Sequence, residues 1–112
     1  MNSEQLLERD VKKEIEWIFE DKKTKLNIDV NLEIIFIEHP TIEGSFVYGE
    51  AFPFEKPPRV RLEVVAIDAT YEELNMVISD ELIHIKHPEI EQYVPDTLEE
   101  REEFIEKMKA YL

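Results

Sequence analysis

The chain contains no cysteine and only two glycines among its 112 residues. Without cysteine it can form no disulfide and offers no thiolate, so any metal must be held by histidine, aspartate or glutamate. No run approaches the roughly 18 apolar residues of a membrane-spanning helix. The first residues, Met1-Asn2-Ser3-Glu4, lack the basic and apolar regions of a signal peptide. These absences predict a cytoplasmic protein.

Positive charge is also scarce, because 13 Lys and Arg stand against 27 Asp and Glu, which gives a net charge of -14. Nucleic acids and anionic membranes both attract proteins through Lys and Arg, so the composition argues against either partner. A metal cation or a neutral or basic peptide suits this negative field better. We expect most of the carboxylates to form a solubilising surface. The frequent Glu, Lys and Ile are also compatible with a thermophilic source.

The apolar residues follow periods that predict one small α+β domain over residues 1–112. A helical stripe covers about residues 3–25, with Ser3 as its cap. Alternating apolar and polar residues then predict three strands. They cover about 26–37, 45–52 and 59–64. The three strands are expected to form one sheet against the helix.

Two further helices are expected after the strands. Thr70 and Glu73 match a capping box that opens a helix, which runs to about His87 because Pro88 cannot continue it. A last helix is predicted at about 98–112. The expected order is therefore helix, three strands, helix, helix.

Glu81 is a carboxylate inside the apolar arc of the predicted helix 71–87. At about 100° per residue, this arc contains Leu74, Val77, Ile78, Leu82 and Ile85. A buried, unpaired carboxylate is costly unless it finds partners or shifts its pKa. Asp80 and His84 share one helical face at the edge of the same arc. Such a polar trio beside a core-facing stripe indicates a functional site.

Each of these residues also has a structural interpretation. Glu81 could extend to solvent past a part of the helix that the sheet leaves uncovered. His84 could be a hydrogen-bonded structural group, and Asp80 a surface residue or its partner in an i,i+4 pair. The joint spacing of the three residues favours the functional interpretation.

Residues Ile78-Ser79-Asp80-Glu81-Leu82-Ile83-His84-Ile85 resemble the active-site helix of zincin metallopeptidases, H-E-x-x-H, with Asp80 at the first histidine. The order of the elements also resembles the zincin fold. The length is similar to that of the minigluzincins, which are small soluble archaeal zinc peptidases. The resemblance implies a minimal gluzincin-type domain that hydrolyses peptides.

The resemblance implies a role for each residue of the motif. His84 would be a zinc ligand, and Glu81 would be the catalytic residue that handles the proton of a metal-bound water. Asp80 would be the other ligand on this helix. An aspartate is shorter, harder and more anionic than a histidine, which would weaken selectivity for zinc and favour Mn, Fe or Mg relative to it. The substitution predicts weak or latent activity, or a metal-free protein.

Gluzincins usually take a third ligand from the following helix, where this chain has no histidine and where the candidate glutamates are Glu99, Glu100, Glu102 and Glu103. Of these, Glu102 and Glu103 are nearest to the usual short gluzincin spacing, whereas Glu99 and Glu100 are less well placed. His87 could contribute instead, but a helix-capping role is the simpler interpretation. The metal ligands predicted by the resemblance are therefore Asp80, His84 and either Glu102 or Glu103.

The resemblance also implies that an edge strand lies above the active-site helix and binds extended peptide by strand addition. Residues 46–52 are the candidate, with Tyr48 near the cleft. Apart from the resemblance, a glycine within a strand, here Gly49, could permit a bulge or a close backbone approach. Arg59 and Arg61 are expected to pair with nearby acids rather than to bind substrate.

Three classes of function remain open at this point. The first is a minimal metallopeptidase, weak or latent, and the second is an inactive relative that serves as a binding or self-associating module. With its apolar stripe and a short proline-containing connection, the last helix could pack against its own domain or swap into a partner to form a homo-oligomer. If it covers the cleft, it would also enforce latency. The third is an unrelated acidic interaction domain in which the motif is a coincidence.

Overall fold

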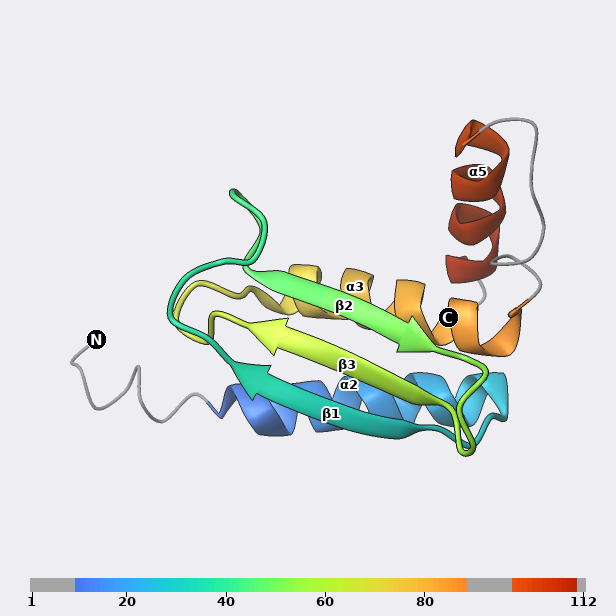
Figure 1. Ribbon diagram of the computed structural model, residues 1–112, viewed down its shortest axis with the longest axis horizontal. Helices are drawn as coiled ribbons and strands as arrows, with labels where there is room; N and C mark the ends of the chain where they lie inside the picture. Colours follow the sequence, from blue (N-terminus) through green and yellow to red (C-terminus); the bar gives the residue numbers. More distant parts are fainter. Residues whose placement is uncertain (1–9, 89–97, 111–112) are drawn as a thin grey trace.

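The structure is a computed structural model that describes residues 10–88 and 98–110. The chain forms a three-stranded sheet. Figure 1 shows long helices along one face of this sheet and a further helix beside the end of one of them. The elements are α2 (Val11–Leu26), β1 (Asn31–Phe36), β2 (Val47–Phe52), β3 (Arg59–Val64), α3 (Tyr71–Lys86) and α5 (Leu98–Lys109). This arrangement confirms the predicted α+β class and the order of the elements. Among the described residues, no helix is both long and apolar enough to cross a membrane.

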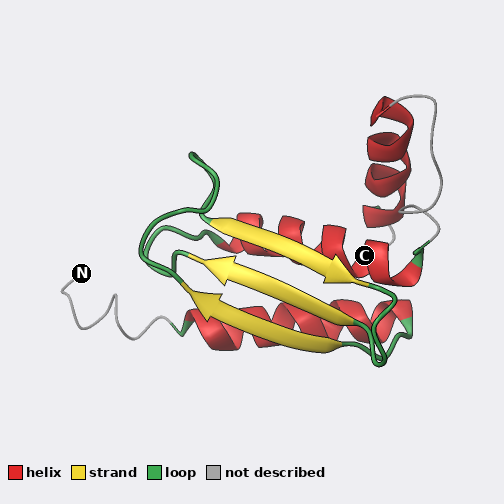
Figure 2. Cartoon of the chain, in the orientation of Figure 1, coloured by secondary structure: helices red, strands yellow, loops and turns green. Residues whose placement is uncertain are grey.

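The sheet has the strand order β1-β3-β2, so the last strand in sequence is the central one. β1 runs parallel to β3, whereas β2 runs antiparallel to it. Both β1 and β2 are therefore edge strands of this sheet. The two strands lie on opposite sides of β3 (Figure 2).

β3 divides the sheet into a buried and an open face. Its apolar residues Val60, Leu62 and Val64 are all 0% exposed and belong to the core under the helices. The alternating Arg59 and Arg61 lie on the opposite face, which Figure 2 shows free of helices. The alternation predicted for residues 59–64 is confirmed.

The first helix and the first strand meet at a different place from the one predicted. Asp10 has an extended backbone and accepts a hydrogen bond from the Lys13 N–H at 3.0 Å, so α2 begins at Val11 rather than near Ser3. Ser3 itself lies outside the described residues. At the other end, the helix includes the buried Leu26, and Asn27 ends it in the left-handed conformation with φ of 53°. The strand predicted from residue 26 therefore starts only at residue 31.

α3 begins with half of the predicted capping box. The Thr70 hydroxyl accepts a hydrogen bond from the Glu73 N–H at 3.1 Å. The Glu73 carboxylate accepts one from the Phe46 N–H, also at 3.1 Å, and so connects α3 to the residue just before β2. The helix ends at Lys86, and the His87 N–H donates to the Ile83 carbonyl at 2.8 Å. His87 is thus the expected helix cap.

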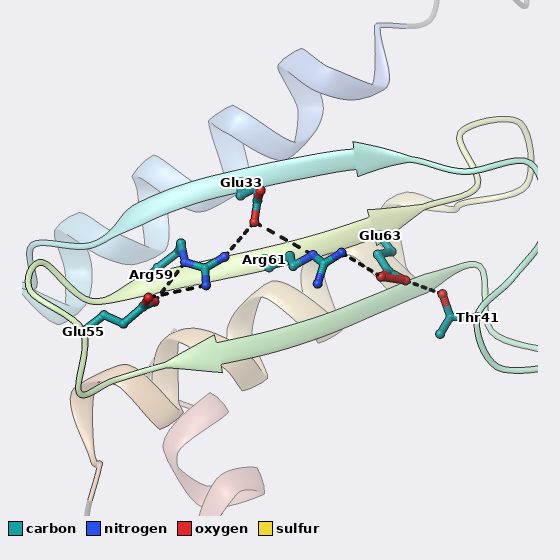
Figure 3. Close-up of polar contacts among 6 residues, drawn as sticks. All are labelled: Glu33, Thr41, Glu55, Arg59, Arg61 and Glu63. Carbon is teal, nitrogen blue, oxygen red and sulfur yellow. Dashed lines mark hydrogen bonds and ion pairs between the residues drawn. The ribbon is translucent and has the colours of Figure 1, made fainter.

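On the open face of the sheet, Arg59 lies between two acids and an aromatic ring (Figure 3). Its guanidinium donates to Glu33 on β1 at 2.7 Å and to Glu55 at 2.9 Å. The same group lies 4.0 Å from the ring centroid of Phe52. The hydrogen bond to Glu55, and then the charges of Glu55 and Glu33, raise the pKa of Arg59 although partial desolvation lowers it. The prediction that Arg59 pairs with nearby acids is confirmed.

Arg61 continues this line of charges along β3 (Figure 3). Its guanidinium lies 3.5 Å from Glu63 and 3.9 Å from Glu33. The Thr41 hydroxyl donates a short hydrogen bond to the Glu63 carboxylate, which joins the preceding loop to the same face. Arg61 also pairs with nearby acids, as predicted.

Candidate functional site

The candidate site lies on α3, which packs against β2, β3, α2 and α5. Leu74, Ile78 and Leu82 in the predicted apolar arc are 0% exposed. Ser79 and Ile83, at 3% and 0%, are buried as well, although both lie outside that arc. The buried surface is wider than predicted because α3 contacts helices on other sides as well as the sheet. The polar residues that remain on α3 therefore lie close to other elements.

Glu81 lies directly beneath Gly49 of β2. A Cβ atom built on Gly49 would stand 2.7 Å from Glu81 Cγ, 2.7 Å from Val77 Cγ1 and 3.2 Å from Glu81 Cδ. Gly49 is in register with Leu62, so its missing side chain would have pointed toward the helix. The absence of a side chain at Gly49 lets α3 and β2 approach closely. The predicted close backbone approach at this glycine is confirmed.

Asp80 and His84 lie one turn apart on α3 and are both half-buried. Around the axis of α3, Asp80 and His84 lie next to Glu81, on the side of the helix that faces α5. The structure therefore brings the three residues of the motif together at the border between β2, α3 and α5. Tyr48 is in register with Glu63, whose side chain lies on the open face. Tyr48 therefore points away from this site, contrary to the expectation that it lies near the cleft.

Asp80 is paired with Lys109, near the end of α5. Asp80 Oδ1 and Lys109 Nζ are 2.5 Å apart, and the two side chains are 33% and 19% exposed. Oδ1 itself is shielded from solvent. Lys109 also contacts Glu106, at 3.2 Å, on its own helix. An ammonium group thus occupies the position beside Asp80 Oδ1.

The surroundings of Lys109 keep it charged. Burial lowers the pKa of this side chain, but hydrogen bonds to Asp80 and Glu106, with their negative charges, have the larger combined effect. The pKa of Lys109 is therefore raised above its ordinary value. At neutral pH the Lys109 side chain is therefore an ammonium.

The predicted third metal ligand does not join this cluster. Glu102 and Glu103 have exposed side chains, and Glu102 is about two turns of α5 away from Lys109. Within residues 10–88 and 98–110, no group of three or more His, Asp or Glu is arranged to hold a metal ion. The described residues therefore do not fit a three-ligand zinc site. The assignments of Glu102, Glu103, Asp80 and His84 as ligands stay predictions.

Sequence reasoning did not identify Lys109 as part of the site. Nothing local to this lysine indicates Asp80 as its partner, because the two residues lie on different helices. The nearest signal is general, since basic residues are favoured in the last turn of a helix by its dipole. A long-range ion pair of this kind depends on how α5 packs.

A depression lies between α2 and the edge strand β1, away from this site, with a volume of about 490 Å³. Its apolar part is formed by Phe19, Val30, Leu32 and Ile34, and its charged part by Lys12, Glu16, Glu20 and Lys23. The charges of the two signs are mixed, which indicates no preference for an anion or a cation.

Comparisons with protein-family models, curated proteins and solved structures gave no match. The resemblance to zincins therefore depends on residues 78–85 and on the order of the elements. It provides a basis for a proposed function.

Proposed function

We propose that this chain is a zincin-like domain whose metal-dependent peptide hydrolysis is weak or latent. The observation that carries the proposal is the position of Glu81, half-buried directly beneath Gly49 of an edge strand. A general base of a peptidase must lie close to the bound peptide bond. The packing of α3 under β2, with Glu81 beneath the strand, supports this role.

β2 supports this proposal because it is an edge strand and packs on α3. The free edge of such a strand can pair with an extended peptide through backbone hydrogen bonds. A peptide added there would pass Gly49 and so come close to Glu81, with Asp80 and His84 next around the helix. The side chain of Glu81 would hold or release a proton at that place.

The expected weakness of the activity follows from the surroundings of Asp80. Zinc, or Mn or Fe given an aspartate at this position, would depend on Asp80, His84 and a glutamate of α5. Asp80 is already paired with Lys109, and the described residues offer no complete ligand set. Hydrolysis would therefore require Lys109 to leave Asp80.

Peptide cleavage by designed variants tests this proposal. Quenched fluorescent peptides of mixed sequence would be incubated with zinc and with the wild-type chain, Asp80→His or Asp80→His/Glu81→Gln. We expect Asp80→His to cleave faster than the wild type, and the added Glu81→Gln to remove that gain. If Asp80→His is as inactive as its Glu81→Gln derivative, the hydrolase proposal is wrong.

The ion pair favours a second candidate, an inactive zincin-like scaffold in the cytoplasm that binds peptide or associates with itself. Asp80 is paired with a lysine, and within the described residues β2 is an edge strand of the sheet. Metal-independent peptide binding with no cleavage by Asp80→His would favour this scaffold. Light scattering over a dilution series tests the predicted homo-oligomer, since a constant monomer mass would exclude exchange of α5.

A further inference from the structure

The outer edge of β1 can pair with a strand from another molecule. Within the described residues, β1 is an edge strand that pairs only with β3. The N–H groups of Asn31 and Ile37 donate to carbonyls on the β3 side, at 2.8 and 2.9 Å. Because backbone groups alternate in direction along a strand, the N–H and C=O groups of Leu32 and Ile34 face the outer edge. β1 contains neither proline nor lysine, which commonly protect such edges.

The depression between α2 and β1 lies beside this edge. Its apolar floor includes the half-buried side chains of Leu32 and Ile34, together with Phe19 and Val30, which are each 3% exposed. In an added strand, side chains directly opposite Leu32 and Ile34 would lie on the same face of the sheet. An added strand would therefore place every second side chain over this floor.

The charged side chains of α2 that border the depression follow a definite order. Along the helix they are Lys12, Glu16, Glu20 and Lys23, so two acids stand between two lysines. Glu16 and Glu20 are about 6 Å apart along the helix axis, at 1.5 Å per residue. Alternate residues of a strand are separated by a similar distance, roughly 6.6 Å. A simple ion gains nothing from this order, but an extended strand with two alternate basic residues matches it.

Lys23 shows how a basic side chain fits at this place. Its ammonium lies 3.5 Å from the Glu20 carboxylate and 5.9 Å from the ring centroid of Phe19, and the side chain is only 27% exposed. The aliphatic stem of a lysine can cover apolar surface while its charge stays at the border with water. A lysine or arginine of an added strand would reach Glu16 or Glu20 in the same way.

The order of the charges argues against a second copy of this chain as the occupant. If two β1 strands paired antiparallel about a two-fold axis through their centres, their α2 helices would approach each other in reverse order. Acids would then face acids, and lysines would face lysines, which is unfavourable. Each chain also has a net charge of -14, which favours a basic partner over an identical one.

We propose that the edge of β1 and the depression beside it bind an extended basic segment of another protein by strand addition. The segment runs antiparallel to β1, which is the more stable pairing, and exchanges backbone hydrogen bonds with Leu32 and Ile34. Two alternate Lys or Arg side chains lie over the apolar floor with their charges at Glu16 and Glu20. This site is separate from Glu81 and the edge of β2, and it requires neither a metal nor hydrolysis.

Fluorescence anisotropy with three labelled peptides tests this site in the full-length chain. The first peptide alternates threonine with four lysines, and the second has the same composition with its lysines in one block. The third is the alternating peptide with N-methyl groups on its lysine backbone nitrogens, which would face β1. We expect the alternating peptide to bind about fivefold more tightly than either of the others, because only it combines strand pairing with both ion pairs. Equal binding of the alternating and block peptides, or no binding of either, would overturn the proposal.

Matched variants test the role of the two acids. Glu16→Gln/Glu20→Gln should bind the alternating peptide about fivefold more weakly than Glu43→Gln/Asp68→Asn, the effect of two exposed ion pairs. Both variants lose two negative charges, and Glu43 and Asp68 are exposed residues outside the depression. Equal affinities of the two variants would show that only the net charge attracts the peptide and would overturn the site.

Amide chemical shifts then locate the bound peptide. We expect the changes to centre on Leu32 and Ile34, whereas changes centred on Gly49 would place the peptide at β2 and overturn the site at β1. A dimer that forms without peptide and shifts the β1 amides would identify a second copy as the occupant and also overturn the proposal. These measurements use no metal and no cleavage, so their outcome is independent of whether Asp80→His hydrolyses peptides.

Discussion

The open face of the sheet and the junction of α3 with α5 both carry half-exposed ion pairs, but the pairs act on different kinds of contact. On the sheet, Arg59 and Arg61 approach the same Glu33, and backbone hydrogen bonds already join their strands. At the junction, Asp80 and Lys109 connect helices that have no shared backbone ladder. The pairs on the sheet reinforce an existing contact, whereas the pair at the junction helps to define one. A similar loss of charge should therefore have a larger structural effect at the junction.

The largest effect is expected where α3 meets β2, at Gly49. Replacing a strand glycine by alanine usually stabilises, but here the new Cβ would stand 2.7 Å from both Val77 Cγ1 and Glu81 Cγ. We expect Gly49→Ala to lower the free energy of unfolding by about 1–3 kcal/mol, as overpacking does. Urea denaturation measures this loss, and Gly49→Ala/Val77→Ala should lose less than the sum of the single changes. Wild-type stability in Gly49→Ala would show that the close approach is not needed.

The second effect concerns the pair at the junction. Lys109→Met should lower the free energy of unfolding by about 0.5–1 kcal/mol, since partial exposure and salt reduce the strength of such a pair. Urea denaturation at low and high sodium chloride would measure the loss, which should shrink as salt increases. The control Lys107→Met should lose less at both salt concentrations. Equal losses for the two lysines would contradict the special position of Lys109.

A smaller effect is expected on the open face of the sheet. Arg61→Met should lower the free energy of unfolding by at most about 0.5 kcal/mol, because its nearest acids are 3.5 and 3.9 Å away and its strand keeps its ladder. The same urea experiment measures this loss, which is then compared with the loss in Lys109→Met. A larger loss for Arg61→Met than for Lys109→Met would reverse the comparison between the two regions.

The smallest expected effect is a decrease, at alkaline pH, in the contribution of Lys109 to the free energy of unfolding. The folded-state pKa of Lys109 is raised, so its contribution to stability is complete below the unfolded pKa of about 10.4 and is lost as pH rises through the folded pKa. The stability difference between wild type and Lys109→Met should be constant near neutral pH and shrink above about pH 10. Thermal unfolding from pH 7 to pH 11 would show it. A difference that grows with pH would have the wrong sign.

Much of the fold could be predicted from the sequence, because the local pattern of apolar and polar residues indicates which side chains are buried. The alternation of Val60, Leu62 and Val64 predicted β3, and proline at position 88 predicted the end of α3. It failed between α2 and β1, where apolar residues continue across the boundary and the left-handed Asn27 ends the helix. Periodicity alone does not reveal such a cap.

The candidate site was predictable only where one element defines it. The helical period placed Glu81 toward the core, and Gly49 explains how the carboxylate fits there. The partner of Asp80 was not predictable, because Lys109 reaches it through the packing of a separate helix. The third ligand stays a prediction for the same reason.

The most direct test of the account is a metal analysis of Asp80→His/Lys109→Met after dialysis against zinc. This variant restores the histidine of the motif and removes the ammonium that contacts position 80. We predict about one bound zinc per chain, and less in Asp80→His/Lys107→Met, where Lys109 remains. A zinc content no higher than in the wild type would contradict the zincin-like site.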